Sequence, residues 1–410
     1  MNGDTCAARA VVIVGASLAG LRAAQAIRDS GFDGRLVLIG DEVHPPYQRP
    51  PLSKAVLAGD AHPDEAALAA DLDVEWRLGT RATSLDPVRR VVGLDDGEVH
   101  YDRLVISTGT FARPWPSDTP LPDGVLTVRT RDDAVELRER LLGGARVVVV
   151  GAGFLGCEVA AAARGLGLPT TLCDVTETPM AVLGPQVGGA YSALHAERGA
   201  DLVLGSGVAG LDGGDRLEAV RLVDGRSVPA DVAVLALGAV PAVDWLEGSG
   251  LPVQDGLVCD ATCTVEGFPE IVACGDVAAW PHALAGGEIV RIEHFNNASQ
   301  QGRHAGEAVL LPHVERQAFD ALPSFWSDQY DVNLQVLGFP RRAMRTVLVE
   351  GDVGERRFVV AGVRGEQVVS IAAVGAPARV RAYRKLLARP VTLDEVRAAV
   401  AADAKGLGST

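Results

Sequence analysis

The chain has 410 residues, of which 48% are hydrophobic and 22% are charged, and its formal net charge at pH 7 is -15. This length is too great for one ordinary hydrophobic core, so we expect two or three folded domains. The negative charge argues against nucleic-acid binding, and no apolar run approaches the roughly 18 residues that a membrane-spanning helix needs. The sequence therefore predicts a globular protein without a membrane span.

The N-terminal segment has the order strand, glycine turn, helix and second strand. "RAVVIVG" precedes the turn "GASLAG", a helix is predicted over 18–29, and "RLVLIGDE" is the second strand. This order is typical of a dinucleotide-binding unit, because the glycines let the backbone approach a pyrophosphate at the helix N-terminus. Asp41 follows the second strand, where an acid holds a ribose. The turn contains Gly15, Ser17 and Gly20, so serine replaces its middle glycine.

The same unit returns about 136 residues later with all three glycines. "ARVVVVGAGFLGCEVAAAARGLGLPTTLCD" contains Gly151, Gly153 and Gly156, then a helix and a strand that ends at Asp174. Asp174 favours NADH over NADPH, because an acid there repels the additional phosphate and 170–180 holds no Lys, Arg or His. Two units predict two dinucleotides, FAD and NADH, whose reactive rings meet between the domains. The alternative is an internal duplication with one inactive site.

Three later apolar strands complete the expected organisation. Two of them end near Gly109 and Gly238, and "PEIVACGDVAAW" ends its strand in a Gly-Asp pair that includes Asp276. Asp276 is placed to accept a hydrogen bond from a polyol chain, although an ordinary turn has the same sequence. We expect an α/β fold with two Rossmann-like dinucleotide-binding domains and a C-terminal α+β domain. The expected domains are 1–112 with 245–321 for FAD, 113–244 for NAD, and 322–410 at the C-terminus.

The cysteines and the N-terminus indicate a cytoplasmic protein. Only Cys259 and Cys263 lie close together among the six cysteines, with no His or second cysteine pair beside them, so we expect no metal site. The N-terminal apolar run leads directly into the glycine turn, and we interpret it as a first strand, not a targeting segment. Reduced cysteines in the cytoplasm are the simplest interpretation.

The segment "HPPYQRPPLSKAVL" surrounds Lys54 with prolines, and Lys54 is the only lysine before Lys385. A lysine carries a compact charge on a flexible stem, so it can reach and stabilise developing negative charge. A solvated turn lysine is the alternative.

Eight motifs occur in the order found in the FAD-dependent, NADH-dependent ferredoxin reductases of the putidaredoxin reductase type. They are "GASLAGL", "PPYQRPPLSK", "ISTGT", "VRTRDDA", "GAGFLGCEVAA", "ACGDVA", "IEHFNNASQQG" and "FWSDQYDVNLQVLG". The resemblance runs from residue 11 to about residue 382, and "RPPLSK" and "FWSDQYD" are specific to this branch of the glutathione reductase superfamily. The chain thus resembles this family over most of its length.

The resemblance implies three residues close to the chemistry. It places Lys54 beside the flavin ring, Glu158 near the nicotinamide, and Trp326 beside the flavin edge from which electrons leave. If Glu158 lies opposite Lys54, the two side chains form an ion pair. Without the resemblance, Glu158 is an acid in the first turns of a helix and Trp326 is a core tryptophan.

The resemblance also implies a set of cofactor contacts. Phe295 stands where many relatives carry tryptophan, so it retains the flat apolar surface and lacks the indole donor. The cofactor-binding residues expected from the motifs and the resemblance together are Gly15, Ser17, Ala19, Gly20, Asp41, Arg49, Lys54, Ala82, Gly109, Arg129, Gly151, Gly153, Gly156, Asp174, Gly238, Asp276 and Phe295.

The absence of a redox-active cysteine pair from the sequence indicates the kind of electron acceptor. Disulfide reductases of this superfamily need a redox-active cysteine pair beside the flavin, but no cysteine lies between Cys6 and Cys157 and the chain has no CxxC. We therefore expect NADH to reduce FAD, and FAD to pass single electrons to a 2Fe-2S ferredoxin. That ferredoxin would serve a cytochrome P-450 or a ring-hydroxylating dioxygenase.

Residues 322–410 carry thirteen Lys and Arg against nine Asp and Glu, about +4, which favours an acidic ferredoxin. The enzyme is expected to be a monomer or weak dimer. Two alternatives stay open. One is reduction of monodehydroascorbate, a quinone or rubredoxin on the same scaffold, and the other is a flavin-bearing redox sensor resembling apoptosis-inducing factor, which would need larger basic patches.

Overall fold

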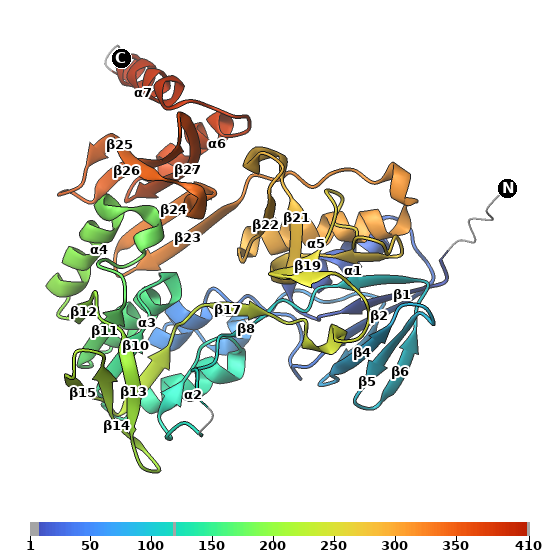
Figure 1. Ribbon diagram of the computed structural model, residues 1–410, viewed down its shortest axis with the longest axis horizontal. Helices are drawn as coiled ribbons and strands as arrows, with labels where there is room; N and C mark the ends of the chain where they lie inside the picture. The colour runs from blue at the N-terminus through green and yellow to red at the C-terminus, as the bar shows by residue number, and fades with distance from the viewer. Residues whose placement is uncertain (1–7, 118–119, 408–410) are drawn as a thin grey trace. The chain divides into compact units, whose positions relative to one another are not determined.

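A computed structural model describes residues 8–117 and 120–407, and its contacts divide the chain into two compact units (Figure 1). The first unit takes the described residues up to Gln48, Ala67–Phe111 and Val240–Pro323. The second unit takes Arg49–Ala66, Ala112–Ala239 and the chain from Ser324 onward.

The first unit is built on a five-stranded parallel sheet with the order β20-β7-β1-β2-β3. Its central strands are apolar without interruption, as expected for strands that are buried on both faces. The strands are β20 (Ile271–Ala273), β7 (Arg103–Ile106), β1 (Ala10–Val14), β2 (Arg35–Gly40) and β3 (Glu75–Leu78).

Two helices of the first unit, α1 (Leu18–Asp29) and α5 (Phe295–Leu310), pack side by side (Figure 1). Their close approach depends on two glycines of α5. A Cβ on Gly302 would lie 2.4 Å from the carbonyl oxygen of Ala19, and one on Gly306 would lie 2.3 Å from that of Ala23. Any side chain at these two positions would push α5 away from the start of α1.

Two small sheets complete the first unit. One has the order β4-β5-β6 and is antiparallel, and the other has the order β18-β19-β21-β22. Their strands are β4 (Ala82–Asp86), β5 (Val91–Leu94), β6 (Gly97–His100), β18 (Val253–Gln254), β19 (Gly256–Val258), β21 (Ala278–Pro281) and β22 (Ile289–Arg291).

The second unit contains another five-stranded parallel sheet, with the order β12-β11-β10-β16-β9. Three helices accompany it: α2 (Arg131–Leu141), α3 (Phe154–Gly165) and α4 (Pro185–Glu197). The strands are β12 (Asp201–Leu204), β11 (Thr170–Asp174), β10 (Val147–Val150), β16 (Val232–Leu235) and β9 (Val125–Leu126). A three-stranded antiparallel sheet is formed by β13 (Val208–Gly213), β14 (Leu217–Leu222) and β15 (Ser227–Pro229).

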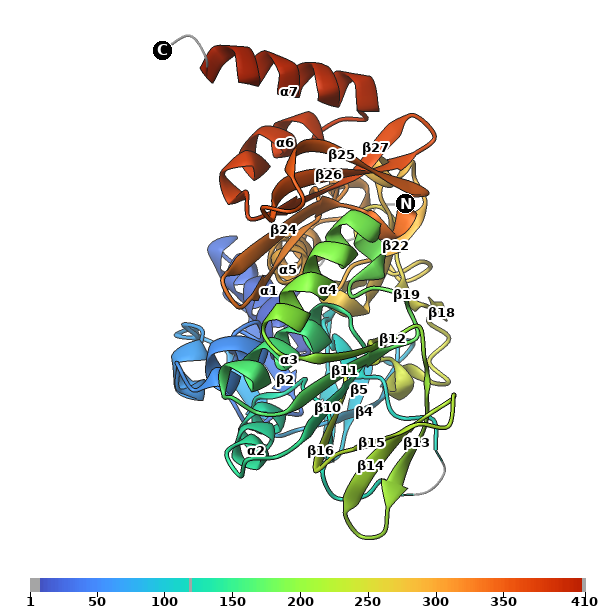
Figure 2. The same ribbon diagram turned by 90° about the vertical axis from the view of Figure 1, so that its left-hand side faces the viewer.

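The C-terminal part of the second unit is an antiparallel sheet with the order β23-β24-β27-β26-β25 and two helices. Figure 2 shows α4 between this sheet and the parallel sheet, with α7 at the far end. The elements are β23 (Ser324–Gln329), β24 (Val332–Gly338), β25 (Arg345–Asp352), β26 (Arg357–Arg364), β27 (Gln367–Val374), α6 (Val380–Leu386) and α7 (Leu393–Leu407).

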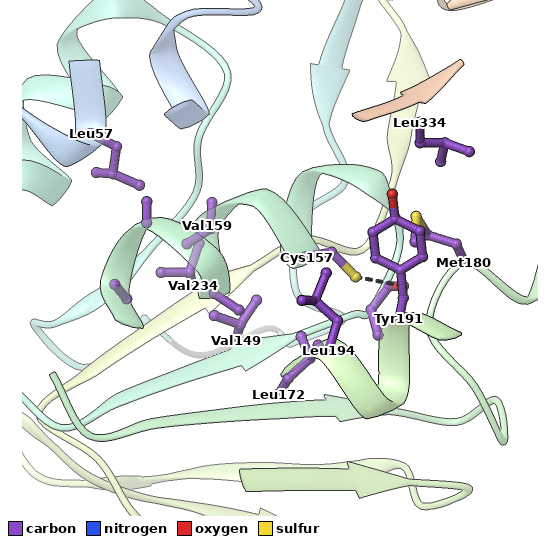
Figure 3. Packing of buried hydrophobic residues seen from close by; sticks show 14 of the residues in the cluster. Leu57, Val149, Cys157, Val159, Leu172, Met180, Tyr191, Leu194, Val234 and Leu334 are labelled. Carbon is purple, nitrogen blue, oxygen red and sulfur yellow. Dashed lines mark hydrogen bonds between the residues drawn. The ribbon is translucent and has the colours of Figure 1, made fainter. Parts of the chain in front are cut away.

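One hydrophobic cluster joins these parts of the second unit. It includes Leu57, Val159 of α3, Tyr191 of α4 and Leu334 of β24, and Figure 3 shows Tyr191 beside Met180 with Leu334 close by. The C-terminal sheet and the parallel sheet of this unit therefore share a core.

The predicted α/β fold with two parallel Rossmann-like sheets and a C-terminal domain is confirmed, and the helix predicted over 18–29 is α1. The exact domain boundaries given above stay predictions. Within the described residues, no helix is both long and apolar enough to cross a membrane.

Candidate functional site

The first glycine turn is shaped by its own backbone. Gly15 has a φ of 115°, and a Cβ there would lie 2.2 Å from the carbonyl oxygen of Ser107, the residue that follows β7. A Cβ on Gly20 would lie 1.9 Å from the carbonyl oxygen of Gly15. Both positions therefore require glycine for the fold itself. Ser17, at the middle position, is the N-cap residue of α1, and its side chain makes no capping hydrogen bond to the described backbone.

A pocket opens at the carboxyl ends of β1 and β2, where α/β folds bind their ligands. It brings together Gly15, Asp41 and Ala82, three of the residues predicted to bind the cofactor. Asp41 is exposed, and Ala82 begins β4. Other residues lining the pocket are Val14, Thr80, Arg81, Thr108, Phe111, Ala242, Asp244 and Trp245. A backbone cradle with an acid at its rim fits the adenosine half of FAD.

Asp276 lies close to the same turn. It follows Gly275, whose φ is 75° and whose Cβ, if present, would lie 3.0 Å from the Cβ of Ala19. The amide of Gly275 donates to Oε1 of Gln301 at 2.9 Å, which fixes the turn against α5. These contacts hold Asp276 near the N-terminal end of α1, where a ribityl chain would follow a pyrophosphate.

Phe295 and Gly109 also belong to the first unit. Phe295 is the first residue of α5 and packs against the core cluster of this unit. Gly109 has a φ of 70°, a conformation that favours glycine, just after β7. The structure thus gathers the predicted FAD contacts of this unit around the ends of β1, β2 and β7.

The second glycine turn repeats the first with one difference. A Cβ on Gly151 would lie 2.3 Å from the carbonyl oxygen of Ala236, and one on Gly156 would lie 1.8 Å from that of Gly151. A Cβ on Gly153 would meet no described atom within 4 Å. Protein packing therefore explains Gly151 and Gly156, whereas the open space at Gly153 suits a ligand that approaches the backbone closely.

Asp174 is tied to this second turn. Its Oδ2 accepts from the amide of Ala152 at 2.5 Å, and its Oδ1 accepts from the amide and the hydroxyl of Thr176, both at 2.7 Å. Sequence reasoning placed Asp174 on a ribose and missed this structural role. Gly238 follows β16 with a φ of 90°, and its carbonyl oxygen accepts from the amide of Arg113 at 2.9 Å.

Lys54 and Glu158 form an ion pair inside the second unit. Lys54 lies in the irregular turn Leu52–Val56 with φ -119° and ψ -105°, and its Nζ is 2.7 Å from Oε2 of Glu158 on α3. The hydroxyl of Ser53 donates to the same oxygen at 2.6 Å. Glu158 is only 6% exposed, and a buried carboxylate needs such partners. The pairing considered from the sequence is present, and the catalytic role of the two residues stays a prediction.

Ser327 of β23 completes the surroundings of Glu158. Its hydroxyl donates to Oε1 of Glu158 at 2.6 Å, and both residues are buried. Sequence reasoning missed Ser327, although strand alternation in "FWSDQ" was a signal, since it sets Ser327 apart from Trp326. Trp326 is half-buried on the opposite face of β23 and pairs in register with Gln335. The structure therefore does not bring Trp326 to Glu158.

Arg49 and Arg129, two further predicted cofactor contacts, meet in the second unit. Nη1 of Arg49 donates to the carbonyl oxygen of Arg129 at 2.5 Å. The amide of Arg129 donates to Asp133, whose side chain is part of the capping box at the start of α2. The capped helix thus fixes the backbone that Arg49 contacts.

The five described cysteines are free and buried. Burial raises the pKa of Cys173 to about 11 and that of Cys263 to about 12, and it raises the pKa of Cys157, Cys259 and Cys274 as well. Thiols in such surroundings are inert at neutral pH. Across the described ranges, His, Cys, Asp and Glu side chains form no group of three or more that could hold a metal ion.

Residues 9–302 match the pyridine nucleotide-disulphide oxidoreductase family, and residues 324–406 match the reductase C-terminal family. The chain is 34% identical over 399 residues to rhodocoxin reductase of Rhodococcus erythropolis, covering 95% of this chain and 92% of that protein. It is 37% identical over 390 residues to the anthranilate 1,2-dioxygenase system ferredoxin–NAD(+) reductase component of Burkholderia cepacia, covering 92% and 93%.

Among solved structures, the chain is similar to putidaredoxin reductase in its covalent complex with putidaredoxin. The TM-score is 0.89 at 30% identity, covering 98% of this chain and 99% of that chain. The glycine turns and the buried ion pair are consistent with these similarities to ferredoxin reductases. The chain belongs to the pyridine nucleotide-disulphide oxidoreductase family, in its branch of ferredoxin reductases that resemble putidaredoxin reductase.

Proposed function

We propose that the chain is an FAD-dependent NADH:ferredoxin oxidoreductase that supplies electrons to a cytochrome P-450 or a ring-hydroxylating dioxygenase. The observation that carries this proposal is the pair of glycine turns in one chain, with an ion pair and only buried thiols among the described residues of the second unit. When bound, FAD accepts hydride from NADH and releases its electrons singly. The relatives named above support the same reaction.

Residues of the first unit bind FAD in this proposal. The turn from Gly15 to Gly20 carries Ser17 and Ala19, and its backbone faces the diphosphate. Asp41 accepts from the adenosine ribose, and the backbone of Ala82 lies beside the adenine. Asp276 accepts from the ribityl chain, and Gly109 and Phe295 line the cofactor. The pocket around Gly15, Asp41 and Ala82 supports this assignment.

Residues of the second unit bind NADH and control charge. The open space at Gly153 admits the NADH diphosphate, and Asp174 favours the unphosphorylated ribose. With both cofactors bound, Lys54 would stabilise negative charge on the flavin ring, and Glu158 would orient the nicotinamide. Arg49, Arg129 and Gly238 contribute backbone and side-chain contacts to the cofactors. The 2.7 Å contact between Lys54 and Glu158 supports their joint action.

We propose a 2Fe-2S ferredoxin with an acidic surface as the partner. The segment Pro340–Arg345 carries Arg341, Arg342 and Arg345 around Met344, which is 80% exposed. Burial and the neighbouring positive charge of Arg364 lower the pKa of Arg342, so Arg364 adds a further guanidinium beside this segment. Such a surface steers an acidic partner, and Trp326 on β23 is the proposed exit for electrons. We further propose a cytoplasmic enzyme that is a monomer or weak dimer.

The proposed function is tested by cytochrome c reduction with NADH in the presence and absence of candidate 2Fe-2S ferredoxins. We expect a strict requirement for a ferredoxin and a steep loss of rate with added salt, because the partners attract through exposed charges. Reduction of a quinone or monodehydroascorbate at a salt-insensitive rate, without any ferredoxin, would reassign the acceptor.

Charge reversal at Arg341, Arg342 and Arg345 tests the docking surface separately. We expect the apparent affinity for ferredoxin to fall at least about tenfold, while reduction of the flavin by NADH is unchanged. Charge reversal at Arg303, an exposed arginine on α5 of the first unit, is the matched control. An unchanged ferredoxin affinity in the triple variant would exclude this surface.

A further inference from the structure

A buried chain of polar side chains runs from Glu158 to the far end of α4. Ser327 donates to Glu158 at 2.6 Å, and Nε2 of Gln329 donates to the hydroxyl oxygen of Ser327 at 3.1 Å. Oε1 of Gln329 lies 3.0 Å from Nε2 of His195, and Nδ1 of His195 lies 3.1 Å from the hydroxyl of Tyr330. Ser327, Gln329 and His195 are each 0% exposed.

The direction of every hydrogen bond in this chain follows from its neighbours. The amide nitrogen of Gln329 donates to Ser327 and to the sulfur of Met180, so the amide oxygen faces His195 and must accept. His195 therefore carries its proton on Nε2 and accepts on Nδ1 from Tyr330. The four hydrogen bonds of this series are therefore all donated in the same direction, from Tyr330 toward the carboxylate of Glu158.

Burial favours the protonation states of His195 and Tyr330 that these donor directions require. Burial lowers the pKa of His195, which keeps its ring neutral, and raises the pKa of Tyr330 to about 12, which keeps its hydroxyl protonated. The ring of Tyr330 contacts His195 edge-on at 5.3 Å between centroids, and the guanidinium of Arg198 lies over the Tyr330 ring at 5.3 Å from its centroid. These two contacts hold the Tyr330 end of the hydrogen-bonded series in place.

We propose that Ser327, Gln329 and His195 are positioning residues that fix the carboxylate of Glu158 beside Lys54 for hydride transfer from NADH. This proposal rests on the proposed role of Glu158 near the nicotinamide. Hydrogen bonds aligned in one direction polarise one another, so the chain strengthens the final bond to the carboxylate. Lys54 and Ser53 hold Oε2, and Ser327 holds Oε1, so neither oxygen can rotate away.

The arrangement also ties two parts of the second unit together. Ser327 and Gln329 lie on the face of β23 opposite Trp326, the proposed electron exit, and His195 belongs to α4. The strand that carries Trp326 is thus attached to the residue proposed to orient the nicotinamide. The geometry of the electron exit and that of hydride entry are set by the same strand.

The kinetic test measures flavin reduction by NADH in the anaerobic stopped-flow instrument, which separates the limiting rate from the dissociation constant of NADH. For Ser327→Ala we expect the limiting rate to fall about tenfold and the dissociation constant to change less than about twofold. Ser327→Thr, which keeps the hydroxyl, should recover most of the rate. Gln329→Met and His195→Phe should give smaller losses in that order, because they act through Ser327.

Ser370→Ala is the matched control. Ser370 is a buried serine on β27 of the same sheet, and we expect its rate to equal that of the wild type. If Ser327→Ala reduced the flavin as fast as Ser370→Ala and the wild type, while Glu158→Gln was slow, the positioning role of Ser327 would be excluded and the role of Glu158 would remain. A normal rate in Glu158→Gln would overturn both, and a wild-type flavin that NADH cannot reduce would refute the proposed function itself.

A second measurement does not depend on turnover. In protein labelled with nitrogen-15 at histidine, the ring signals that disappear in His195→Phe should show a protonated Nε2 and an unprotonated Nδ1 near neutral pH. The opposite tautomer or a cationic ring would overturn the proposed direction of the chain, whatever the activity of the enzyme.

Discussion

The two glycine turns of the molecule share their outer glycines and differ in the middle. In both, a Cβ at the third glycine would lie less than 2 Å from the carbonyl oxygen of the first: 1.9 Å at Gly20 and 1.8 Å at Gly156. The middle position is Ser17 in one turn and Gly153, with open space around its missing Cβ, in the other. The outer glycines therefore serve the fold, whereas packing does not require the middle glycine, which we propose leaves space for the ligand.

The acids that follow the two turns differ as well. Asp41 is exposed at the rim of a pocket, whereas Asp174 holds the amides of Ala152 and Thr176. Asp41 thus has the exposure that its proposed ribose contact needs, whereas Asp174 also fixes the backbone of its own turn. The same sequence pattern therefore contains residues that packing requires and residues whose proposed role is binding.

The largest effect is expected from the third glycine of each turn. Gly20→Ala and Gly156→Ala each drive a methyl group into a backbone carbonyl, so we expect a loss of about 3 kcal/mol or more in the free energy of unfolding. Chemical denaturation measures this loss. The control is Gly165→Ala, a helical position where a Cβ meets no described atom within 4 Å. Equal stability of Gly156→Ala and Gly165→Ala would contradict the packing explanation.

Substitution of Gly153, the middle residue of the second glycine turn, is expected to weaken NADH binding without changing the fold. In Gly153→Ser the side chain has room in the protein, so the free energy of unfolding should change by less than about 0.5 kcal/mol. The dissociation constant of NADH should rise about tenfold, because the serine occupies space for the diphosphate. Ser17→Gly should retain FAD as the wild type does. Unchanged NADH binding in Gly153→Ser would show that this space is not used by the ligand.

The two acids should respond differently to amidation. Asp174→Asn weakens the hydrogen bonds to Ala152 and Thr176, so we expect a loss of about 1–2 kcal/mol in the free energy of unfolding and a weaker preference for NADH over NADPH. Asp41→Asn should change the free energy of unfolding by less than about 0.5 kcal/mol and lower FAD affinity. Denaturation and stopped-flow reduction by each nucleotide measure these changes. If the two substitutions destabilised the protein equally, the distinction between the acids would fail.

The effect expected from the smallest chemical change, the addition of a proton, is a pH dependence of stability. Burial lowers the pKa of His195 in the second unit and of His304 in the first. Each unfolded histidine takes up a proton near its ordinary pKa of about 6.5, before the folded one does. The free energy of unfolding should therefore fall as the pH drops below about 6.5, by up to about 1.4 kcal/mol per pH unit for each histidine. His195→Phe should reduce this slope, and an unchanged slope would exclude His195 as a source.

Local chain geometry explains what could be predicted from the sequence. The helix over 18–29 and the two glycine turns each lie within a single strand-turn-helix segment. Glycines and the spacing of apolar residues determine the structure of such a segment locally, so the sequence predicts it. The contacts of Glu158 could not be derived in this way. Ser327 reaches Glu158 across 169 residues of sequence, and this contact depends on how β23 packs against α3. Likewise, no local signal showed that Arg49–Ala66 packs with the second unit.

We propose above that the chain takes hydride from NADH on FAD and passes single electrons to a ferredoxin. The most direct test is anaerobic mixing of the FAD-loaded protein with NADH, followed by mixing with oxidised 2Fe-2S ferredoxin. We expect NADH to bleach the flavin faster than NADPH, and each reduced flavin to reduce about two ferredoxin molecules. A flavin that NADH does not bleach, or a reduced flavin that every ferredoxin leaves reduced, would contradict the claim.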